Sequence, residues 1–586
     1  MLGGPPLEAY VRAALWISLS LMTACGGAKT TEAPVAPAPA PVPIDAPPPP
    51  PTFQVAPVSV EGADRLTMPV AAPSATFDGA AHDLAYTILR RTGDEGFGQL
   101  YDRDMKPVTG EHAMCNEQDF NSILTVDGQP FLVSHFECTP GSMTVSKLVV
   151  ADDGKLSMGS STPVDWSPVD GLWNPCAGQV TPWNTHLGSE EYEPDARTEP
   201  TEDQYWPHRA WTGMQRFDPE GIDPYAYGWI PEVRITDAEG THSVVKYLAP
   251  GRASHEIAYV LPDQKTVYLS DDGTAVGWFL FVADTPADLS AGHLYAARYE
   301  QKGDVLGIGW VPLGHATDEQ LRPHLERGLS FDELFQVAEP ADGACAEGFT
   351  FVRHHYGEEC LKLAEPTEAV PDPGLIASRF EKRRYAGLVG ASLELEKGEG
   401  VTFDPETGRV YVAVSKITKT MTDDEGQVSL APNGCGIVYG GPTAKGVVDT
   451  EGKAIPSDHV MTALEPDVVG RPTADGKACE ADGIANPDNI TFMPEHRQLV
   501  IAEDTSKHPN AFLWTANVED LSAPLQKLMV APPYGEFTGL HWIEGVGGHD
   551  WLTVTVQHPW SEGAGELPDG ISEDDTRTFT GVLGPF

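Results

Sequence analysis

The sequence predicts an all-β protein: a β-propeller, or another repeat architecture, with long loop insertions. Three segments share one strand–turn–strand pattern: Arg252–Asp272, Lys397–Ser415 and Asn486–Asp504. Recurring hairpins are typical of repeat folds, and the copies are separated by plausible multiples of a blade of roughly 40–50 residues. Only Ser330–Ala338 has a persuasive helical pattern, because Ser330 can act as N-cap and Glu333 completes a capping box.

Each copy of the repeat aligns on an apolar residue that ends its first strand: Val260, Phe403 and Phe492. A proline two positions later predicts a turn, because proline fixes φ and cannot donate to a strand ladder. Apolar residues seven and nine positions after the anchor predict the return strand. A carboxylate lies four positions before each anchor: Glu256, Glu399 and Asp488.

These carboxylates share one structural position, at the start of the first strand of each hairpin. In a propeller the innermost strands line a central channel, so the acids would converge there. Converging carboxylates repel one another, and a bound cation is the usual remedy. Taken singly, each acid is more simply explained as a solvated strand end, and Asp488 with Asn489 also suits a turn.

The remaining segments are assigned from residue alternation, turn residues and length. Strands are predicted within Phe120–Val150, Trp278–Val282, Leu294–Tyr299 and Glu536–His558. Long loops or excursions are predicted over Val169–Glu191, Tyr192–Trp229, Glu339–Pro373 and Gly426–Gly483.

The charge balance of the chain is strongly acidic. Its 586 residues include 86 Asp and Glu against 38 Lys and Arg, which gives a net charge of −48. A phosphate backbone would be repelled, so no nucleic-acid partner is expected. The excess suits an exported protein in a saline or calcium-containing medium, although a solvated acidic surface explains most of these charges.

The start of the chain resembles an export signal. Arg12 is the single positive charge of residues 1–24, and the apolar stretch Ala13–Ala24 is too short to span a bilayer. Small residues before Cys25 resemble a bacterial lipoprotein box, which predicts a signal peptide over residues 1–24 and lipidation of Cys25. The alternatives are an ordinary secretory signal or an uncleaved anchor.

Residues 25–60 are predicted to form an extended, semi-rigid tether, because they are rich in proline and alanine. Residues 61–586 would then form the folded propeller domain. We expect a monomer in the cell envelope that touches a membrane only through its lipid, in the outer membrane and periplasm or at the cell surface.

The cysteines predict disulfides, because export favours them. Proximity in the sequence favours three pairs: Cys115–Cys138, Cys345–Cys360 and Cys435–Cys479. Cys176 is left over. A lone thiol in an exported protein is either buried and inert, which is the simpler interpretation, or a metal ligand.

Six separated motifs, in order, resemble the PhoX-type alkaline phosphatases: NPCAGQVTPWNTHLGSEE (174–191), GRASHE (251–256), DLSAGHLYAA (288–297), KGEGVTFDPETGRVYVAVS (397–415), NPDNITF (486–492) and EFTG…VQHP (536–559). The resemblance extends from about residue 120 to 560. It implies a propeller with six blades and an axial site that holds calcium ions and an oxo-bridged iron pair. It also implies that small phosphate monoesters are the substrates.

The resemblance also assigns the metal ligands. Cys176 matches the iron-binding cysteine, and Glu191, Glu256 and Glu399 match the metal-bridging glutamates. Glu503, Asp504 and Asp488 are candidates for completing the calcium sites. The chemistry is coherent, because a thiolate suits iron (Fe3+) and clustered carboxylates suit Ca2+.

Lys397 is a candidate catalytic residue, because it stands where phosphatases of this type carry a phosphate-contacting arginine. Lysine is a point charge without the bidentate fork, so phosphate binding is expected to be weaker or different, and a surface lysine is the alternative. His135 and Glu137 could approach the site, although a hydrogen-bonded structural role is the simpler interpretation. His255 is expected to orient Glu256 or a neighbouring backbone group.

Two other functions remain open. One is a non-catalytic calcium-binding propeller that serves as a surface binding module. The other is a calcium-dependent, lactonase-like hydrolase. The sequence contains no G-x-S-x-G elbow, H-E-x-x-H motif, phosphate-binding G-x-x-x-x-G-K loop or C-x-x-C motif that would favour other chemistries.

Overall fold

The computed structural model describes residues 53–59, 66–77, 79–110, 112–341, 343–560 and 566–586. The predicted signal peptide, Cys25 and most of the predicted tether lie outside the described residues. Among the helices described, none has both the length and the apolar character needed to cross a membrane.

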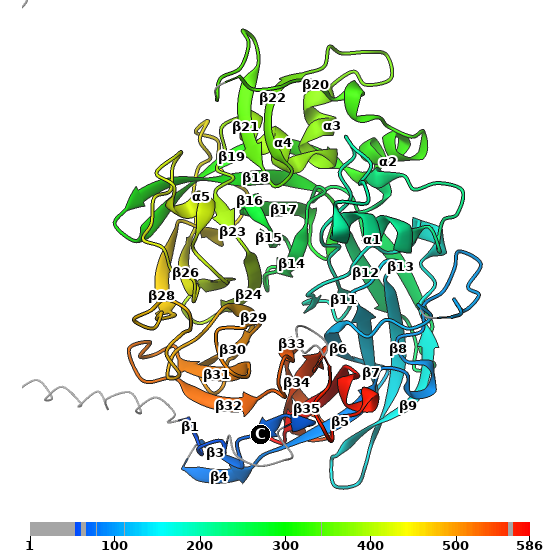
Figure 1. The fold of residues 1–586 in the computed structure, drawn as a ribbon, viewed down its shortest axis with the longest axis vertical. Coiled ribbons are helices and arrows are strands. Elements are labelled where there is room, and N and C mark those ends of the chain that lie inside the picture. Colours follow the sequence, from blue (N-terminus) through cyan, green and yellow to red (C-terminus); the bar gives the residue numbers. More distant parts are fainter. Residues whose placement is uncertain (1–52, 60–65, 78, 111, 342, 561–565) are drawn as a thin grey trace, which may run out of the picture. The chain divides into compact units, whose positions relative to one another are not determined.

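Antiparallel strands recur in groups of four along the chain (Figure 1). The first two groups are β6 (Gln118–Val126), β7 (Gln129–Phe136), β8 (Ser142–Val150) and β9 (Leu156–Pro163), then β10 (Gln179–Val180), β11 (His186–Leu187), β12 (Ile230–Ile235) and β13 (His242–Tyr247). The next two are β14 (His255–Val260), β15 (Thr266–Asp271), β17 (Phe279–Thr285) and β18 (Asp288–Lys302), then β24 (Gly398–Asp404), β25 (Arg409–Val414), β26 (Ile437–Ala444) and β28 (Ala463–Val469). The last two are β29 (Pro487–Met493), β30 (Gln498–Glu503), β31 (Phe512–Asn517) and β32 (Gln526–Val530), then β33 (Glu536–Val546), β34 (His549–Gln557), β35 (Phe579–Gly584) and β5 (Ala85–Arg91).

The leading strands of these groups contact one another in a closed cycle: β6, β10, β14, β24, β29, β33 and β6 again. They surround the middle of Figure 1. β5, from early in the chain, pairs with β35 and completes the last group. The fold is therefore propeller-like, as predicted. The number of blades stays a prediction, because β19 (Val305–Thr317) pairs with β28 and joins the third and fourth groups into one sheet.

The three repeat segments form the predicted hairpins β14–β15, β24–β25 and β29–β30. The apolar positions of their return strands are buried: Val267, Leu269, Val410, Val412, Leu499 and Ile501. These side chains pack in cores between neighbouring groups of strands. Burial of each contributes about 1.5–3 kcal/mol, so the same residues that define the repeat also hold adjacent groups together.

Shorter strands lie outside these groups. β1 (Gln54–Val55), β3 (Ser74–Phe77) and β4 (Ala80–Asp83) form one small sheet, and β2 (Val70–Ala71) pairs with β32. β1 precedes the predicted domain boundary at residue 61. β16 (Thr274–Val276) pairs with β23 (Leu395–Glu396), β27 (Val460–Met461) pairs with β26, and β20 (Phe335–Ala338), β21 (Thr350–His354) and β22 (Gly357–Leu363) form a sheet. Several segments predicted as loops therefore contain strands.

The helical prediction is wrong in its extent. The capping box of Ser330 and Glu333 is present, but it caps only a 3-10 turn over Phe331–Glu333, after which β20 pairs with β22. The α-helices lie elsewhere: α1 (Tyr205–Met214), α2 (Asp318–Glu326), α3 (Pro373–Phe380), α4 (Lys382–Leu388) and α5 (Lys419–Thr422). They are short, and Pro207 and Pro323 lie inside α1 and α2, so their periodicity is weak.

The structure contains the three expected disulfides: Cys115–Cys138, Cys345–Cys360 and Cys435–Cys479. Cys176 is the free, buried cysteine of the described chain.

Candidate metal centre

The carboxylates of the repeat lie at β-bulges. The register shifts between His255 and Ala258 on β14, between Gly398 and Val401 on β24, and between Pro487 and Ile490 on β29. Each bulge therefore contains the acid of its hairpin. A bulge changes the direction of a side chain locally, and bulges are common beside active sites.

β6 has the same bulge, between Gln118 and Asn121, and it contains Asp119. Asp119 lies four positions before Ile123, as the other acids precede their anchors. This copy of the repeat is hidden in the sequence, because Thr125 and not a proline follows Ile123 at the expected place. The spacing of acid to apolar anchor was the signal that could have found it.

The structure brings five of the predicted metal ligands together. Ligand atoms of Cys176, Glu191 and Glu256 lie within 4.8 Å of one another, and so do those of Glu256, Glu399 and Asp488. A third group, with the same limit of 4.8 Å, joins Cys176 to two acids that the sequence had not assigned as ligands, Asp119 and Glu137. We call these seven residues the acid–thiol cluster: Asp119, Glu137, Cys176, Glu191, Glu256, Glu399 and Asp488.

A second set of acids borders the cluster, at or next to the ends of strands. Asp272 follows β15 and is one of the neighbours that, after burial, raise the pKa of Glu191; Asp504 follows β30 and does the same to Glu536 at the start of β33. Asp504 therefore lies near the cluster, and its role as a calcium ligand stays a prediction. Asp272 and Glu536 were not among the predicted ligands, although an acid directly after a return strand, as at Asp272, is a pattern visible in the sequence.

Glu503 is not brought to the cluster. It is buried, and its carboxylate accepts hydrogen bonds from Phe512 N and Trp514 Nε1 at 2.9 and 2.6 Å and pairs with His508 Nδ1 at 2.9 Å. Successive side chains of a strand point to opposite faces, so Asp504 and Glu503 cannot both face the cluster. The structure therefore gives Glu503 a structural role, and its prediction as a ligand is not supported.

The loop before β10 positions the thiol and one glutamate. Cys176 N donates to Ser189 O and Glu191 N donates to Asn174 O, both at 3.1 Å. The Asn174 amide donates to Glu137 at 3.1 Å and to Glu191 at 3.3 Å, and the Cys176 thiol donates to Glu256 Oε2 at 3.3 Å. This loop thus connects three carboxylates of the cluster to the sulfur.

Glu190, the neighbour of Glu191, has a different environment. It is fully buried and ion-pairs with Lys246 Nζ at 2.7 Å. It also accepts hydrogen bonds from the backbone of Trp173, Gly228 and Trp229. Lys246 therefore compensates the charge of Glu190 without a metal, whereas Glu191 has no such ion pair among the described residues.

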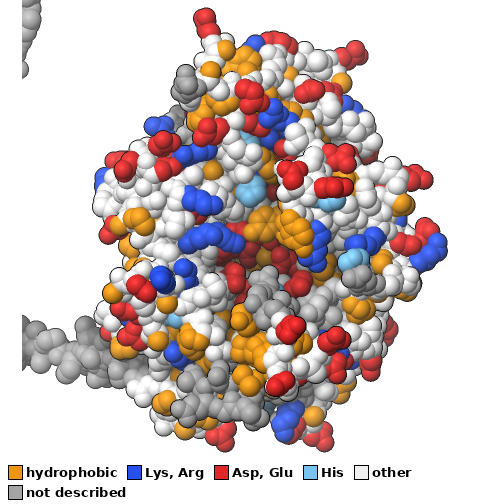
Figure 2. Space-filling model, in the orientation of Figure 1, with side chains coloured by type: hydrophobic (Ala, Val, Ile, Leu, Met, Phe, Trp, Pro, Cys, Tyr) orange, Lys and Arg blue, Asp and Glu red, His pale blue; other side chains and the backbone are white. Residues whose placement is uncertain are grey.

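Lys397 lies at the cluster. Its Nζ contacts Asp272 Oδ2 at 2.8 Å and Glu399 Oε1 at 3.3 Å, and its side chain is 24 % exposed. Among the described residues, it is the only lysine or arginine that ion-pairs with a member of the acid–thiol cluster. Tyr192 also donates a hydrogen bond to Asp272, so the carboxylate that holds Lys397 is itself fixed. Figure 2 shows acidic side chains near the middle of this face, with basic side chains beside them.

The protein alone does not neutralise the cluster. Burial and then neighbouring carboxylates raise the pKa of Glu256 and Glu399 well above its usual range, and burial followed by Asp504 raises the pKa of Asp488 to about 7. Burial, then Glu256, raises the pKa of the Cys176 thiol. Asp272, which borders the cluster, is the exception: burial raises its pKa, but Lys397, Glu191 and Tyr192 together lower it further.

The donor set fits bound cations. Glu399 Oε1 and Asp119 Oδ1 are buried and accept no well-formed hydrogen bond among the described groups, although Lys397 Nζ lies 3.3 Å from the first and His135 Nε2 lies 3.7 Å from the second, and this is costly for carboxylates. Oxygen ligands suit calcium, and a thiolate suits a softer metal such as iron. A cation would lower these pKa values and supply the missing partners.

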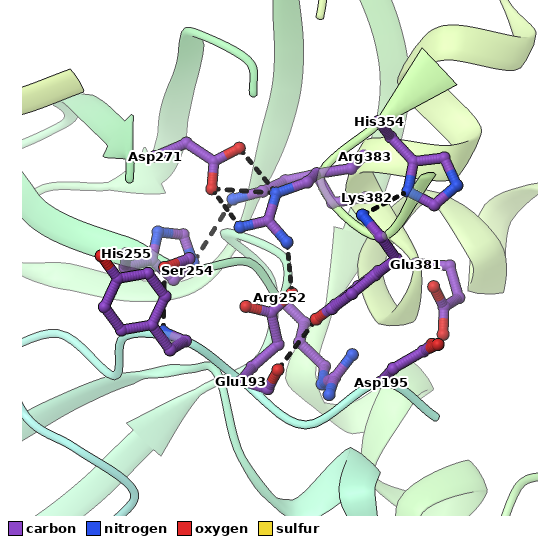
Figure 3. Close-up of polar contacts among 12 residues, drawn as sticks. Glu193, Asp195, Arg252, Ser254, His255, Asp271, His354, Glu381, Lys382 and Arg383 are labelled. Atoms are coloured by element: carbon purple, nitrogen blue, oxygen red, sulfur yellow. Dashed lines mark hydrogen bonds and ion pairs between the residues drawn. The ribbon is translucent and has the colours of Figure 1, made fainter. Parts of the chain in front are cut away.

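Basic side chains of helix α4 anchor the β14–β15 hairpin (Figure 3). Arg383 donates to Asp271 at 2.6 Å and to Glu193 at 2.6 Å, and Lys382 Nζ lies 3.4 Å from His255 Nε2. His255 pairs with Asp271 across the hairpin, and its Nε2 lies 2.8 Å from Gly251 O. His255 directly precedes Glu256, and Asp271 directly precedes Asp272. By holding His255 and Asp271, α4 fixes the backbone that presents both acids.

Arg383→Met is expected to destabilise the protein by about 3–5 kcal/mol, because it leaves Asp271 and Glu193 buried without their partner. Denaturant unfolding measures the change. Arg471→Met is the matched control, because Arg471 pairs with Glu480 at the surface and should contribute less than about 1 kcal/mol. Equal losses in the two variants would contradict the anchoring role of Arg383.

The chain is similar to known proteins in sequence and in fold. The family model described as alkaline phosphatase PhoX matches residues 146–560. A structure of Pseudomonas fluorescens PhoX in complex with vanadate, a transition state analogue, is 17 % identical, with a TM-score of 0.56 over 89 % of this chain and 97 % of that chain. A structure of a putative 6-phosphogluconolactonase from Bacteroides uniformis is 10 % identical, with a TM-score of 0.29 over 83 % of this chain and 98 % of that chain. No curated protein matches the chain.

Proposed function

Because the chain belongs to the alkaline phosphatase PhoX family, we propose that it hydrolyses small phosphate monoesters at the acid–thiol cluster, with calcium and iron as its metals. The convergence of buried carboxylates and one thiol from separate strands carries this proposal. A purely structural core would not collect this many buried carboxylates beside a single lysine, because each uncompensated charge costs free energy when it is buried.

The donor atoms divide the metals between two parts of the cluster. Cys176, Glu191 and Glu256 include the thiol and would hold iron, whereas Glu256, Glu399 and Asp488 offer only oxygen and would hold calcium. Glu256 belongs to both groups and would bridge them. When bound, these ions supply the positive charge that a phosphate needs beside so many carboxylates.

Lys397 is the residue of this chain that we assign to the phosphate. Its Nζ can donate to a phosphate oxygen while Asp272 holds it at 2.8 Å. Asp272 keeps the lysine charged and oriented, and Tyr192 fixes Asp272 through its hydroxyl. Glu399 and Asp272 beside the lysine are buried, and a low-dielectric surrounding strengthens an ionic contact relative to water.

Lys397→Met is expected to raise KM for p-nitrophenyl phosphate about 10- to 100-fold, because a charged hydrogen bond contributes about 1.5–3 kcal/mol. Lys397→Arg should retain binding or improve it, because arginine offers a bidentate fork. Initial-rate kinetics on the metal-loaded protein measure both. Lys445→Met, which removes an exposed lysine paired with Asp458, is the control. Unchanged KM in Lys397→Met would exclude the lysine from phosphate binding.

We also propose that the enzyme is exported and anchored by lipid at Cys25, with residues 25–60 as its tether. The lipoprotein-like sequence before Cys25 supports this location. Cys25→Ala should move the protein from the membrane fraction to the soluble fraction without changing phosphatase activity per molecule. A protein that stays with the membrane in that variant would contradict a lipid anchor.

Hydrolysis of p-nitrophenyl phosphate at alkaline pH, with and without vanadate, tests the proposed function. Vanadate is a transition state analogue for the P. fluorescens protein, so it should inhibit this enzyme too. A protein shown to contain calcium and iron that neither turns over the substrate nor binds vanadate would contradict phosphomonoesterase activity. Such a result would instead favour a calcium-binding module.

A further inference from the structure

A second group of metal-binding side chains lies outside the acid–thiol cluster. Asp284, His293 and His315 come from three neighbouring strands, β17, β18 and β19. One ligand atom from each lies within 4.8 Å of the others. Among the described residues, this is the only such group that contains two histidines.

The sheet places the three side chains on one face. His293 and His315 are directly paired across β18 and β19. His293 is also paired with Val282 on β17, and Asp284 lies two residues further along that strand, so it shares the face of Val282. The register shifts between Ala283 and Thr285, so Asp284 itself sits at a bulge.

The side chains are already close to a coordinating arrangement. His315 Nε2 lies 2.8 Å from Asp284 Oδ2, and the rings of His293 and His315 are 4.8 Å apart between centroids at an interplanar angle of 62°. Ligands about 2.0–2.1 Å from a tetrahedral zinc are about 3.4 Å apart, so the 2.8 Å pair would open slightly and the wider separations would close by at most about 1.4 Å. The long ladder between β18 and β19 holds the two histidine backbones in place.

The group is accessible and separate from the proposed phosphatase site. The side chains of His315 and Asp284 are 37 % and 45 % exposed, so an ion can reach them from solvent. Glu256 lies on β14, and β15 stands between β14 and β17 in the sheet. No member of the acid–thiol cluster belongs to this group of three.

We propose that Asp284, His293 and His315 form a second metal site, selective for Zn2+ over Ca2+, that links three neighbouring strands of this sheet. Two imidazoles and one carboxylate are ligands typical of zinc, whereas calcium prefers oxygen alone. Three protein ligands leave the fourth tetrahedral position to water. Bound zinc would connect β17, β18 and β19 and stabilise the native state.

Equilibrium dialysis against Zn2+ in excess Ca2+, with metal quantification, tests the site in the whole protein. The double variant His293→Gln/His315→Gln should bind one zinc ion fewer than the wild type. Either single variant should weaken the affinity for this zinc ion more than about 100-fold. Even the loss of a group that only orients a metal ligand typically lowers metal affinity about 10- to 100-fold. His208→Gln, a change of one half-buried histidine on α1, is the matched control.

Two further readouts make the test independent of the phosphatase. The increase in Tm on addition of Zn2+ should be similar in the wild type and in His208→Gln. It should be smaller in the double variant. Co2+ should give the visible absorption of a site with two imidazoles in the wild type, and this absorption should be lost in the double variant. Equal zinc stoichiometry in the wild type and the double variant would overturn the proposal, as would equal shifts in Tm. In either case the three residues would form only a hydrogen-bonded surface cluster.

Discussion

Replacing Glu399 with glutamine is expected to lower kcat/KM for p-nitrophenyl phosphate about 100- to 1,000-fold. Glu399 lies at the bulge of β24, its Oε1 accepts no hydrogen bond, and it shares a 4.8 Å group with Glu256 and Asp488. Loss of one negative ligand weakens the metals that neutralise the phosphate, and removal of a single charge-stabilising group at an active site typically costs about that much.

The same variant should be more stable than the wild type when calcium is removed by chelation. In the metal-free protein Glu399 is buried among carboxylates that raise its pKa, and a neutral glutamine of the same shape removes that repulsion. With calcium added, the order should reverse, because only the wild type keeps the full ligand set. Thermal unfolding with and without chelator measures both effects.

Glu406→Gln is the control for Glu399→Gln. Glu406 lies in the turn of the same hairpin, and its side chain is 74 % exposed. The variant Glu406→Gln should leave both the phosphatase activity and the calcium-dependent stability unchanged. If Glu399→Gln behaves like Glu406→Gln, the glutamate is a strand-end residue and not a ligand.

Replacing Cys176 with alanine is expected to remove iron from the protein and to reduce turnover at least about 100-fold. The thiol is buried 3.3 Å from Glu256 Oε2, within the group that also contains Glu191. Serine is a less severe change in volume, but its hydroxyl is much harder to deprotonate than a thiol, so Cys176→Ser should also lose iron while retaining calcium. Metal analysis and initial rates on the same preparations measure the two effects.

The cysteine variants also separate the phosphatase from a calcium-only hydrolase. A calcium-only enzyme should tolerate Cys176→Ala, because calcium binds oxygen and not sulfur. Full activity with calcium but no iron in Cys176→Ala would therefore assign the reaction to the carboxylates alone. Cys176→Ala should still fold, because it removes only one sulfur atom from the interior. Circular dichroism checks that the variant keeps its secondary structure.

The hairpins and their acids could be predicted from the sequence because period-2 alternation and proline turns are local signals. Glu256, Glu399 and Asp488 share a spacing to an apolar anchor, and the structure brings them together. Asp119 has the same spacing but lacks the proline, so only the bulge of β6 reveals it. The convergence of these strands is a long-range property that no single segment contains.

Other features could not be predicted because tertiary contacts determine them. Glu503 and Asp504 are adjacent acids, and only the direction of their side chains separates a structural from a site residue. The segment after Ser330 has a genuine capping box, yet pairing with β22 converts it to a strand after one turn. Arg383 resembles a surface residue in the sequence but is buried between Asp271 and Glu193.

The most direct test of the account is the calcium dependence of p-nitrophenyl phosphate hydrolysis at alkaline pH. The purified protein is assayed as isolated, after chelation of calcium, and after calcium is restored, with calcium and iron quantified at each stage. We expect turnover to disappear on chelation and to return with calcium, in proportion to the metal bound. Turnover that persists in protein shown to be free of calcium would contradict a calcium-dependent site at the acid–thiol cluster.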